Sequence, residues 1–329
     1  MTVKQAIEVG VKELGKAHTH DPEGCARFLL RYALGEDPIK MSLADPDKTL
    51  SRGQKQKFRD MLDRRLRHEP VWYITNEAYF WRDAFYVDGR VLIPRPETEL
   101  LVETVLADVR QRMENSKSRI DDSRVSSHGS RLSVIDVGTG AGVIAISLAK
   151  ELTGPRANQL TSKVVAASAR PLVSSASRQL VIYATDISPG AIEVAKKNAE
   201  RLGVEGNIRF LVGDALEPLP EPVDIIVGNP PYVPSETVGG LAYDIHHFEP
   251  RIALDGGKDG LDVHRKILAQ ARKKLRKHGA IFLEIGHDQG RLAAKAARQH
   301  FPRANVGILK DYDGNDRILS VKTKGGAYD

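Results

Sequence analysis

An asparagine followed by two prolines and a tyrosine is the part of the chain best suited to chemistry. Asn229, Pro230, Pro231 and Tyr232 come directly after an apolar run at residues 223–227. Proline has no N–H group and favours an extended backbone, so the Pro230 carbonyl can accept a hydrogen bond outside any helix or sheet. The Asn229 side-chain oxygen is a second acceptor. Two fixed acceptors would orient a planar NH₂ group, and the Tyr232 ring could pack on the flat face of that group.

Such an arrangement suits a reaction at a poor nitrogen nucleophile. The lone pair of an amide or exocyclic amino nitrogen is delocalised, so orientation is where a site can contribute most. A histidine base is not needed, because the nitrogen becomes acidic once it is alkylated and can lose its proton to water; His246 and His247 are interpreted as solvated loop residues. Alone, the motif is also compatible with an ordinary turn. It does not separate glutamine from adenine.

A glycine-rich turn provides a second element. It consists of Gly138, Thr139, Gly140, Ala141 and Gly142. Glycine permits a tight turn and lets a ligand approach the backbone closely. The dinucleotide fingerprint would need its third glycine at position 143, which is Val143, so the match is to G-x-G-x-G instead. This spacing favours S-adenosylmethionine, whose methionyl part needs backbone amides but no phosphate cradle; a plain strand-to-helix turn is the alternative.

Two residues after later apolar runs extend the cofactor prediction. An acidic residue that accepts ribose hydroxyls is expected about 20 residues beyond the glycine turn. Asp186 lies about 18 residues beyond it once residues 154–179 are set aside. Its alternative role would be a helix N-cap, but Ser188, followed by a proline, suits that role better. Ala215 follows the next run, where the adenine ring would lie, on position alone.

Alternating strand-like and helix-like segments predict how these residues are positioned. Strands are expected at residues 134–137, 180–185, 208–212, 223–227 and 280–285, and helices at 143–151, 189–202 and 261–278. The alternation predicts an α/β chain with a doubly wound, Rossmann-like parallel sheet. Ligands of such sheets bind beyond the carboxyl ends of the strands. The predicted site residues therefore belong at one edge of the sheet.

The chain before the sheet reads as a small helical domain followed by a linker. Residues 1–15 form an amphipathic pattern, Asp21 and Ser51 are candidate N-caps, and Gly35 is a candidate helix terminator. We expect a helical domain over residues 1–70 and a β-hairpin linker over 71–96, with the hairpin turn at Asp88 and Gly89. The second domain would span residues 97–329.

Composition limits the partners and the location. The net charge of +6 is the sum of +2 from residues 112–132 and +4 from residues 154–179, two Ser-rich segments that we interpret as flexible insertions. A folded basic face, and with it a stable nucleic-acid partner, is not expected. No apolar run reaches about 18 residues, so no membrane segment is expected, and the cytoplasm is the predicted location. Cys25 is the only cysteine, and no metal site is predicted.

Apart from these two segments, the sequence resembles the HemK-like release factor glutamine N5-methyltransferases over almost its whole length. The resemblance rests on the glycine turn, on the Asn-Pro-Pro-Tyr motif, and on residues 93–99 (IPRPETE), 248–251 (FEPR), 253–257 (ALDGG) and 283–286 (LEIG). Sister enzymes that act on a ribosomal-protein glutamine look like Arg-Ser-Pro where this chain has Arg95 and Pro96. DNA adenine methyltransferases lack the helical domain and the linker.

The resemblance implies a seven-stranded methyltransferase sheet and methyl transfer from S-adenosylmethionine to the glutamine of a Gly-Gly-Gln motif in release factors. It implies that Asn229 and Pro230 hold the substrate amide and that Tyr232 packs on it. Pro231 belongs to the same catalytic motif, and Asn229 also borders the cofactor. It further implies that residues 138–142, Asp186 and Ala215 line the cofactor site. The helical domain would dock the release factor, and the chain would act as a monomer.

Three alternatives to this function stay open. They are an N6-adenine methyltransferase acting on DNA or RNA, a glutamine methyltransferase of a ribosomal protein, and a non-catalytic binder that keeps the fold. The chain also departs from the family pattern, because His68 and Asn76 stand where glycines are usual in the linker. Arg95 and Glu97 have two competing roles, a surface ion pair at a helix start or a place at the cofactor pocket.

Overall fold

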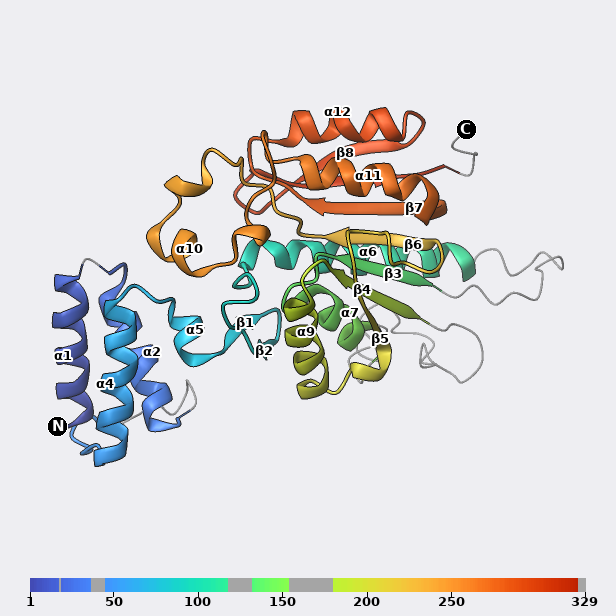
Figure 1. Cartoon of the computed structure of the whole chain (residues 1–329). Coiled ribbons are helices and arrows are strands. Elements are labelled where there is room, and N and C mark those ends of the chain that lie inside the picture. Colours follow the sequence, from blue (N-terminus) through green and yellow to red (C-terminus); the bar gives the residue numbers. More distant parts are fainter. Residues whose placement is uncertain (18, 37–44, 118–131, 154–179, 325–329) are drawn as a thin grey trace. The chain divides into compact units, whose positions relative to one another are not determined.

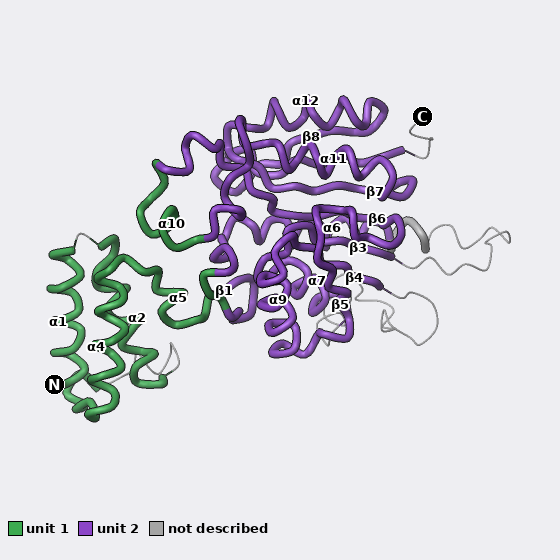
Figure 2. The backbone as a smooth tube through the Cα atoms, in the orientation of Figure 1, with its two compact units in different colours: residues 1–78, 87–89, 240–249 green, residues 79–86, 90–239, 250–329 purple. Residues whose placement is uncertain are grey.

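The computed structural model describes residues 1–17, 19–36, 45–117, 132–153 and 180–324. The chain divides into two compact units (Figure 2). Unit 1 comprises residues 1–78, 87–89 and 240–249, and unit 2 comprises residues 79–86, 90–239 and 250–329. Two short later segments thus join the N-terminal helices in unit 1, a feature that no sequence pattern indicated.

Unit 1 is helical. Its helices are α1 (Val3–Lys16), α2 (Pro22–Leu34), α4 (Arg52–Leu66), α5 (Val71–Thr75) and α10 (Tyr243–Phe248). Asp21 caps α2, Gly35 ends it with a φ of 71°, and Ser51 caps α4 in a capping box, as the sequence predicted. The helices enclose a core that includes Leu14, Leu29, Phe58 and Leu62.

Helix α10 corrects one prediction. His246 and His247 are exposed, as expected, but they lie in this helix rather than in a loop. The His247 ring stacks on Tyr243 with centroids 4.7 Å apart, and Tyr243 also meets the edge of His68. Six residues are too few for helical periodicity to be visible in the sequence.

The hairpin turn was predicted at the wrong place. Strands β1 (Ala78–Phe80) and β2 (Asp83–Phe85) pair as a small sheet with their turn at Trp81 and Arg82, not at Asp88 and Gly89. Trp81 adopts a left-handed φ of 57°, which is strained for a bulky residue. Its backbone N–H donates to Glu99 Oε1 at 2.7 Å, and its indole Nε1 donates to Glu151 Oε1 at 3.0 Å. Tertiary contacts, rather than turn-forming residue types, therefore fix this turn.

A seven-stranded sheet forms the centre of unit 2 (Figure 1). The strands are β3 (Ser133–Val137), β4 (Val181–Asp186), β5 (Ile208–Val212), β6 (Val223–Gly228), β7 (Leu275–Glu284), β8 (Asn305–Lys310) and β9 (Asp316–Lys322). They lie in the order β5-β4-β3-β6-β7-β9-β8, and β9 runs antiparallel to both of its neighbours, β7 and β8. The predicted α/β class and seven-stranded, doubly wound sheet are confirmed.

Helices cover both faces of this sheet (Figure 1). On one face lie α6 (Glu99–Lys117), α7 (Val143–Thr153) and α9 (Pro189–Arg201), and on the other lie α11 (Asp262–Lys274) and α12 (Gly290–His300). Ile135 and Val137 of β3 point into the core shared with α11 and α12. Short 3-10 turns occur at η1 (Pro96–Thr98), η2 (Glu205–Asn207), η3 (Val238–Gly240) and η4 (Arg251–Ala253). No helix in the described ranges is both long and apolar enough to cross a bilayer.

Two predicted boundaries change. Residues 112–117, assigned to a flexible insertion, continue α6, while the rest of that segment up to residue 131 and all of residues 154–179 lie outside the described residues. The predicted helix at 261–278 stops at Lys274, because β7 begins at Leu275. Polar residues at 276–278 directly follow Leu275, so no continuous apolar run marks the beginning of this strand.

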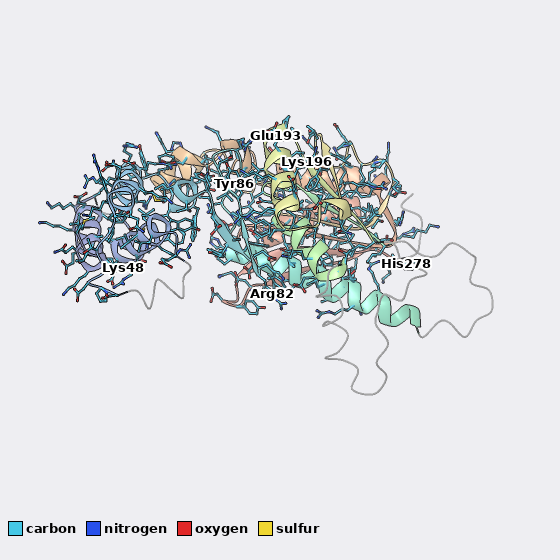
Figure 3. All side chains as sticks on the ribbon, turned by 90° about the horizontal axis from the view of Figure 1, so that it is seen from below. Lys48, Arg82, Tyr86, Glu193, Lys196 and His278 are labelled. Carbon is cyan, nitrogen blue, oxygen red and sulfur yellow. The ribbon has the colours of Figure 1, made fainter. Side chains whose placement is uncertain are left out.

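The segment after the hairpin is held on α9. The Tyr86 N–H donates to Asn198 Oδ1 at 2.7 Å, and the Lys197 ammonium lies over the Tyr86 ring, 3.2 Å from its centroid. Figure 3 shows Tyr86 beside this helix, where Glu193 and Lys196 are labelled. Arg90, further along the segment, pairs with Glu193 at 2.9 Å. These contacts fix the stretch that leads to one wall of the site.

Candidate active site

A cavity opens at the carboxyl ends of the parallel strands of unit 2, where the sequence analysis placed the site. Nine of the predicted site residues line it: Gly138, Thr139, Gly140, Ala141, Asp186, Ala215, Asn229, Pro230 and Pro231. Gly142 and Tyr232, also predicted at the site, are not part of its lining. All lining residues belong to unit 2.

The glycine turn presents bare backbone to this cavity. Gly138 and Gly140 have φ angles of 71° and 53°, a conformation that disfavours side chains, and a Cβ atom on either would meet no heavy atom within 4 Å. The N–H groups of Gly138 and Thr139 both donate to the Thr185 carbonyl, at 2.8 and 2.9 Å. The turn is thus anchored to β4 while space remains beside its two glycines.

Gly142 does not line the cavity but lies where two helices pack closely together. Its φ is 83°, and a Cβ atom there would lie 2.8 Å from Ile146 Cδ1 and 3.2 Å from Ala195 Cβ. Ile146 lies on α7 and Ala195 on α9. The third glycine of the motif therefore lets these two helices approach each other.

Asp186 is the last residue of β4 and joins the two loops beside the cavity. Its Oδ2 accepts the Gly140 N–H and its Oδ1 accepts the Ser188 N–H, both at 2.9 Å. Burial raises the pKa of this carboxyl despite those two hydrogen bonds. Ser188 caps α9, with Pro189 in the first turn, as predicted. Each carboxylate oxygen keeps acceptor capacity for a ligand hydroxyl.

Asp136, for which the sequence analysis predicted no role, accepts hydrogen bonds from the glycine turn and from α7. It is fully buried and accepts the Thr139 hydroxyl at 2.7 Å and the Ala145 N–H at 3.1 Å. Burial raises its pKa to about 7. Because Asp136 contacts both the turn and the start of α7, it sets the position of Thr139 relative to the helix.

Near Ala215 the cavity is lined by an ion pair that sequence reasoning missed. Ala215 is buried and has a φ of 53°, so the chain turns sharply there. Next to it Asp214 pairs with Lys266 of α11 at 2.7 Å, and both side chains line the cavity. Lys266 comes from a helix 52 residues later, so no local pattern could have linked the two.

Asn229 has its side-chain amide oriented by the protein. Its Nδ2 donates to the Thr98 hydroxyl at 3.0 Å, and Thr98 Oγ1 donates to Glu284 Oε2 at 2.7 Å. Among the described residues no donor reaches Asn229 Oδ1 or the Pro230 carbonyl oxygen. Asn229 and Pro230 both line the cavity.

Glu284 and Thr98 are the two buried residues that hold the Asn229 side chain through successive hydrogen bonds. Their exposed fractions are 1% and 3%, and burial raises the pKa of Glu284 to about 7. The Tyr232 hydroxyl donates to Glu284 Oε1 at 3.3 Å, and burial raises the Tyr232 pKa. Both Thr98 and Glu284 lie inside motifs quoted for the family resemblance. Their role was missed because it exists only once η1 and β7 meet, 186 residues apart in the chain.

Arg95 and Glu97 occupy different surroundings in the structure. Arg95 lines the cavity, whereas Glu97 is exposed and does not. Glu97 lies in η1, ahead of α6, which begins at Glu99. Gln289 Nε2 donates to the backbone carbonyl of Tyr232 at 2.8 Å. The wall next to the Asn-Pro-Pro-Tyr motif is thus built by residues from three separate parts of the sequence.

Comparison with known proteins identifies the family. The chain is 36% identical to a release factor glutamine methyltransferase of Moorella thermoacetica, over 97% of this chain and 98% of the relative. It is 33% identical to one of Cereibacter sphaeroides, over 98% and 99%. The chain belongs to the release factor glutamine methyltransferase family. The resemblance seen in the sequence motifs is therefore confirmed.

Two domain families of known proteins match parts of this release factor glutamine methyltransferase homologue. Residues 5–75 match the PrmC N-terminal domain, and residues 128–249 match a methyltransferase domain. A solved release-factor-specific protein-(glutamine-N5) methyltransferase from Alicyclobacillus acidocaldarius is 26% identical, covering 70% of this chain and 94% of that one, with a TM-score of 0.35. The family assignment rests on the sequence relatives and not on that superposition.

Proposed function

We propose that this chain transfers a methyl group from S-adenosylmethionine to the side-chain amide nitrogen, N5, of the glutamine in the Gly-Gly-Gln motif of peptide chain release factors. One observation carries the chemistry: the Asn229 amide is turned so that its NH₂ group meets Thr98. Its Oδ1 and the Pro230 carbonyl oxygen are therefore the acceptors that remain beside the cavity. Family membership supports the substrate.

The residues of the cavity fit the proposed cofactor. A Cβ atom on Gly138 or Gly140 would project into open space, and because glycine has none, the methionyl part can approach the backbone of the turn closely. Asp186 offers two carboxylate oxygens to ribose hydroxyls, and Ala215 borders the place proposed for the adenine ring. When bound, S-adenosylmethionine supplies an electrophilic methyl group on a sulfonium centre.

The substrate amide needs orientation more than a base. An amide NH₂ group has two hydrogens, and Asn229 Oδ1 with the Pro230 carbonyl oxygen would accept one each. Held in this way, the nitrogen faces the methyl group without rotating, which removes much of the entropic cost of the reaction. The nitrogen gains a methyl group and loses one proton to water, so no side chain has to accept that proton.

Tyr232 and Pro231 would complete the substrate side. We propose that the Tyr232 ring packs on the flat face of the amide, with its hydroxyl kept on Glu284. Pro231 lines the cavity and keeps the backbone of the motif extended. In this proposal the hydrogen bond to Glu284 fixes the Tyr232 hydroxyl and so orients the ring toward the substrate amide.

Three alternatives are less well supported. An N6-adenine methyltransferase on DNA or RNA would use the same acceptors, and a ribosomal-protein glutamine methyltransferase would use the same reaction. The relatives at 33–36% identity over nearly the whole chain carry the release factor name, which favours the first proposal. A non-catalytic binder would not need the Asn229 side chain to be held by two successive hydrogen bonds.

We propose unit 1 as the part that docks the release factor, because residues 5–75 match the PrmC N-terminal domain. The proposed location is the cytoplasm, where release factors act in translation. We propose a monomer without a stable nucleic-acid partner. In the domain division that we propose, residues 1–70 form the docking domain, 71–96 the linker and 97–329 the catalytic domain.

Label transfer tests the function. The purified chain is incubated with S-adenosylmethionine carrying a labelled methyl group and with either a release factor or its tip variant in which the glutamine is alanine. We expect label on the tip glutamine, located by peptide mass spectrometry, and none on the variant. Label on neither protein, but on nucleic acid or a ribosomal protein, would replace the proposal with one of its alternatives.

A further inference from the structure

We propose that Thr98 and Glu284 are positioning residues that fix which way the Asn229 amide faces, so that its oxygen and not its NH₂ group meets the substrate. This inference rests on the proposed function, since it assigns how the acceptor for the substrate amide is set. Neither Thr98 nor Glu284 needs to touch the reacting atoms. Both act through Asn229.

The geometry is a continuous chain of hydrogen bonds. Asn229 Nδ2 lies 3.0 Å from Thr98 Oγ1, and Thr98 Oγ1 lies 2.7 Å from Glu284 Oε2. Thr98 and Glu284 are buried, with exposed fractions of 3% and 1%. Water therefore cannot replace either partner easily, and the direction of each hydrogen bond matters for the next.

An ionised Glu284 imposes one direction on that chain. A carboxylate can only accept, so the single proton of the Thr98 hydroxyl must be donated to it. The Thr98 oxygen is then left to accept, and among the described residues the Asn229 NH₂ group is the donor that reaches it. The Asn229 oxygen must therefore point away from Thr98, and the Asn229 side chain lines the cavity.

A neutral Glu284 loses this control. A carboxylic acid can donate to Thr98 Oγ1, and the Thr98 hydroxyl can then donate to Asn229 Oδ1. The Asn229 amide would turn over and present its NH₂ group to the substrate NH₂ group, a pairing of two donors. Since two donors cannot pair, the substrate amide would not be oriented for methyl transfer in such a site.

The surroundings of Glu284 place this switch near neutral pH. Burial raises its pKa to about 7, while Arg317 of β9 lowers the pKa and Glu97 of η1 raises it. The Tyr232 hydroxyl donates to Oε1. The ring of His264 of α11 hydrogen-bonds to the Glu284 backbone carbonyl at 2.7 Å, and burial lowers the His264 pKa to about 4, so this ring is neutral where Glu284 titrates.

Variants of Thr98 test the relay in the full-length protein with a release factor as substrate. Thr98→Val removes the hydroxyl but keeps the shape, and we expect kcat to fall roughly tenfold or more with little change in KM. Thr98→Ser restores the hydroxyl and should restore kcat. Thr323→Val is the matched control, because Thr323 is also buried in unit 2 and loses one hydrogen bond, to the Gly279 carbonyl.

The pH profile separates positioning from structural support. For the wild type we expect kcat to fall as the pH drops below about 7, the pKa of Glu284. In Thr98→Val that acidic limb should be absent, because the ionisation no longer reaches Asn229, and Thr98→Ser should show it again. Glu284→Gln should lower kcat and also lose the limb, whereas Glu151→Gln, an equally buried control on α7, should keep it.

The outcomes discriminate between the two proposals. If the wild type methylates the release factor and both Thr98→Val and Glu284→Gln keep its kcat and its acidic limb, the positioning role is wrong and the function stands. If the wild type leaves the release factor unmodified, the proposed function and this inference both fail. Should Thr98→Val not fold, as judged by its thermal transition, Glu284→Gln and its pH profile decide the question.

Discussion

Asn198 donates its side-chain Nδ2 to the backbone carbonyl oxygen of Ala141 at 2.9 Å, which ties α9 to the glycine turn. The same nitrogen donates to the Tyr86 carbonyl, and Asn198 Oδ1 accepts the Tyr86 N–H. Asn198 is fully buried. One side chain thus joins the cofactor turn, a helix and the segment after the hairpin.

Removing this side chain should loosen the cofactor site and the fold together. Asn198→Ala leaves three backbone groups without their partner, and we expect a loss of about 3 kcal/mol in the free energy of unfolding. Affinity for S-adenosylmethionine should fall as well. Urea unfolding and calorimetric titration measure the two effects, with the exposed Asn207 changed to alanine as the control. Wild-type values for Asn198→Ala would contradict this account of the turn.

Alanine substitutions at Gly140 and Gly142 should have different effects on cofactor affinity and on stability. Gly140→Ala places a methyl group in open space at the cavity wall, at a φ of 53°. We expect it to weaken cofactor binding strongly and to cost only about 1 kcal/mol in stability. Gly142→Ala places its methyl group 2.8 Å from Ile146 Cδ1 and 3.3 Å from Ala195 Cα, so it should destabilise the fold more. Equal losses of affinity and stability in both variants would refute the distinction.

The contribution of Glu284 to the free energy of unfolding should depend on pH. Its pKa in the fold is about 7, above the ordinary value of 4.5, so the folded state binds the proton more tightly than the unfolded state. That proton-linked stability is complete below about pH 4.5 and is lost as the pH rises through 7. Glu284→Gln cannot ionise. Relative to the wild type, it should therefore gain stability between pH 5 and 8 in urea unfolding; a constant difference across this range would contradict the raised pKa.

Five strands of the sheet and nine of the residues that line the cavity could be predicted from the sequence, because their signals are local. Apolar runs followed by a glycine turn, by Asp186 or by Asn229 mark strands whose carboxyl ends carry ligands. The caps at Asp21, Ser51 and Ser188 were also legible, since a cap needs only its own turn of helix.

What the sequence could not give depends on contacts between distant segments. Thr98 meets Glu284, Asp214 meets Lys266, and Trp81 is held in its left-handed turn by Glu99 and Glu151. No spacing rule connects such pairs. The assignment of Gly142 to the cofactor had the same limit, since only the approach of α7 to α9 reveals what its missing side chain permits.

Residues 154–179 should be dispensable for methyl transfer. Helix α7 ends at Thr153 and β4 begins at Val181, so the removed stretch joins the amino end of a parallel strand, away from the edge that carries the cavity. Replacing it with a short linker should leave kcat within about threefold of the wild type. A deletion variant that keeps its thermal transition but loses methyl transfer would show that this view of the segment is wrong.

The central claim is that the Asn229 oxygen holds the substrate amide, and Asn229→Ala tests it most directly. The measurement is a single turnover of release factor methylation with saturating S-adenosylmethionine, followed by mass spectrometry, with the exposed Asn305 changed to alanine as the control. We predict a rate roughly 100-fold lower, because an acceptor used in the transition state is lost, and a cofactor dissociation constant within about fivefold of the wild type. A rate within about threefold of the wild type would contradict the account.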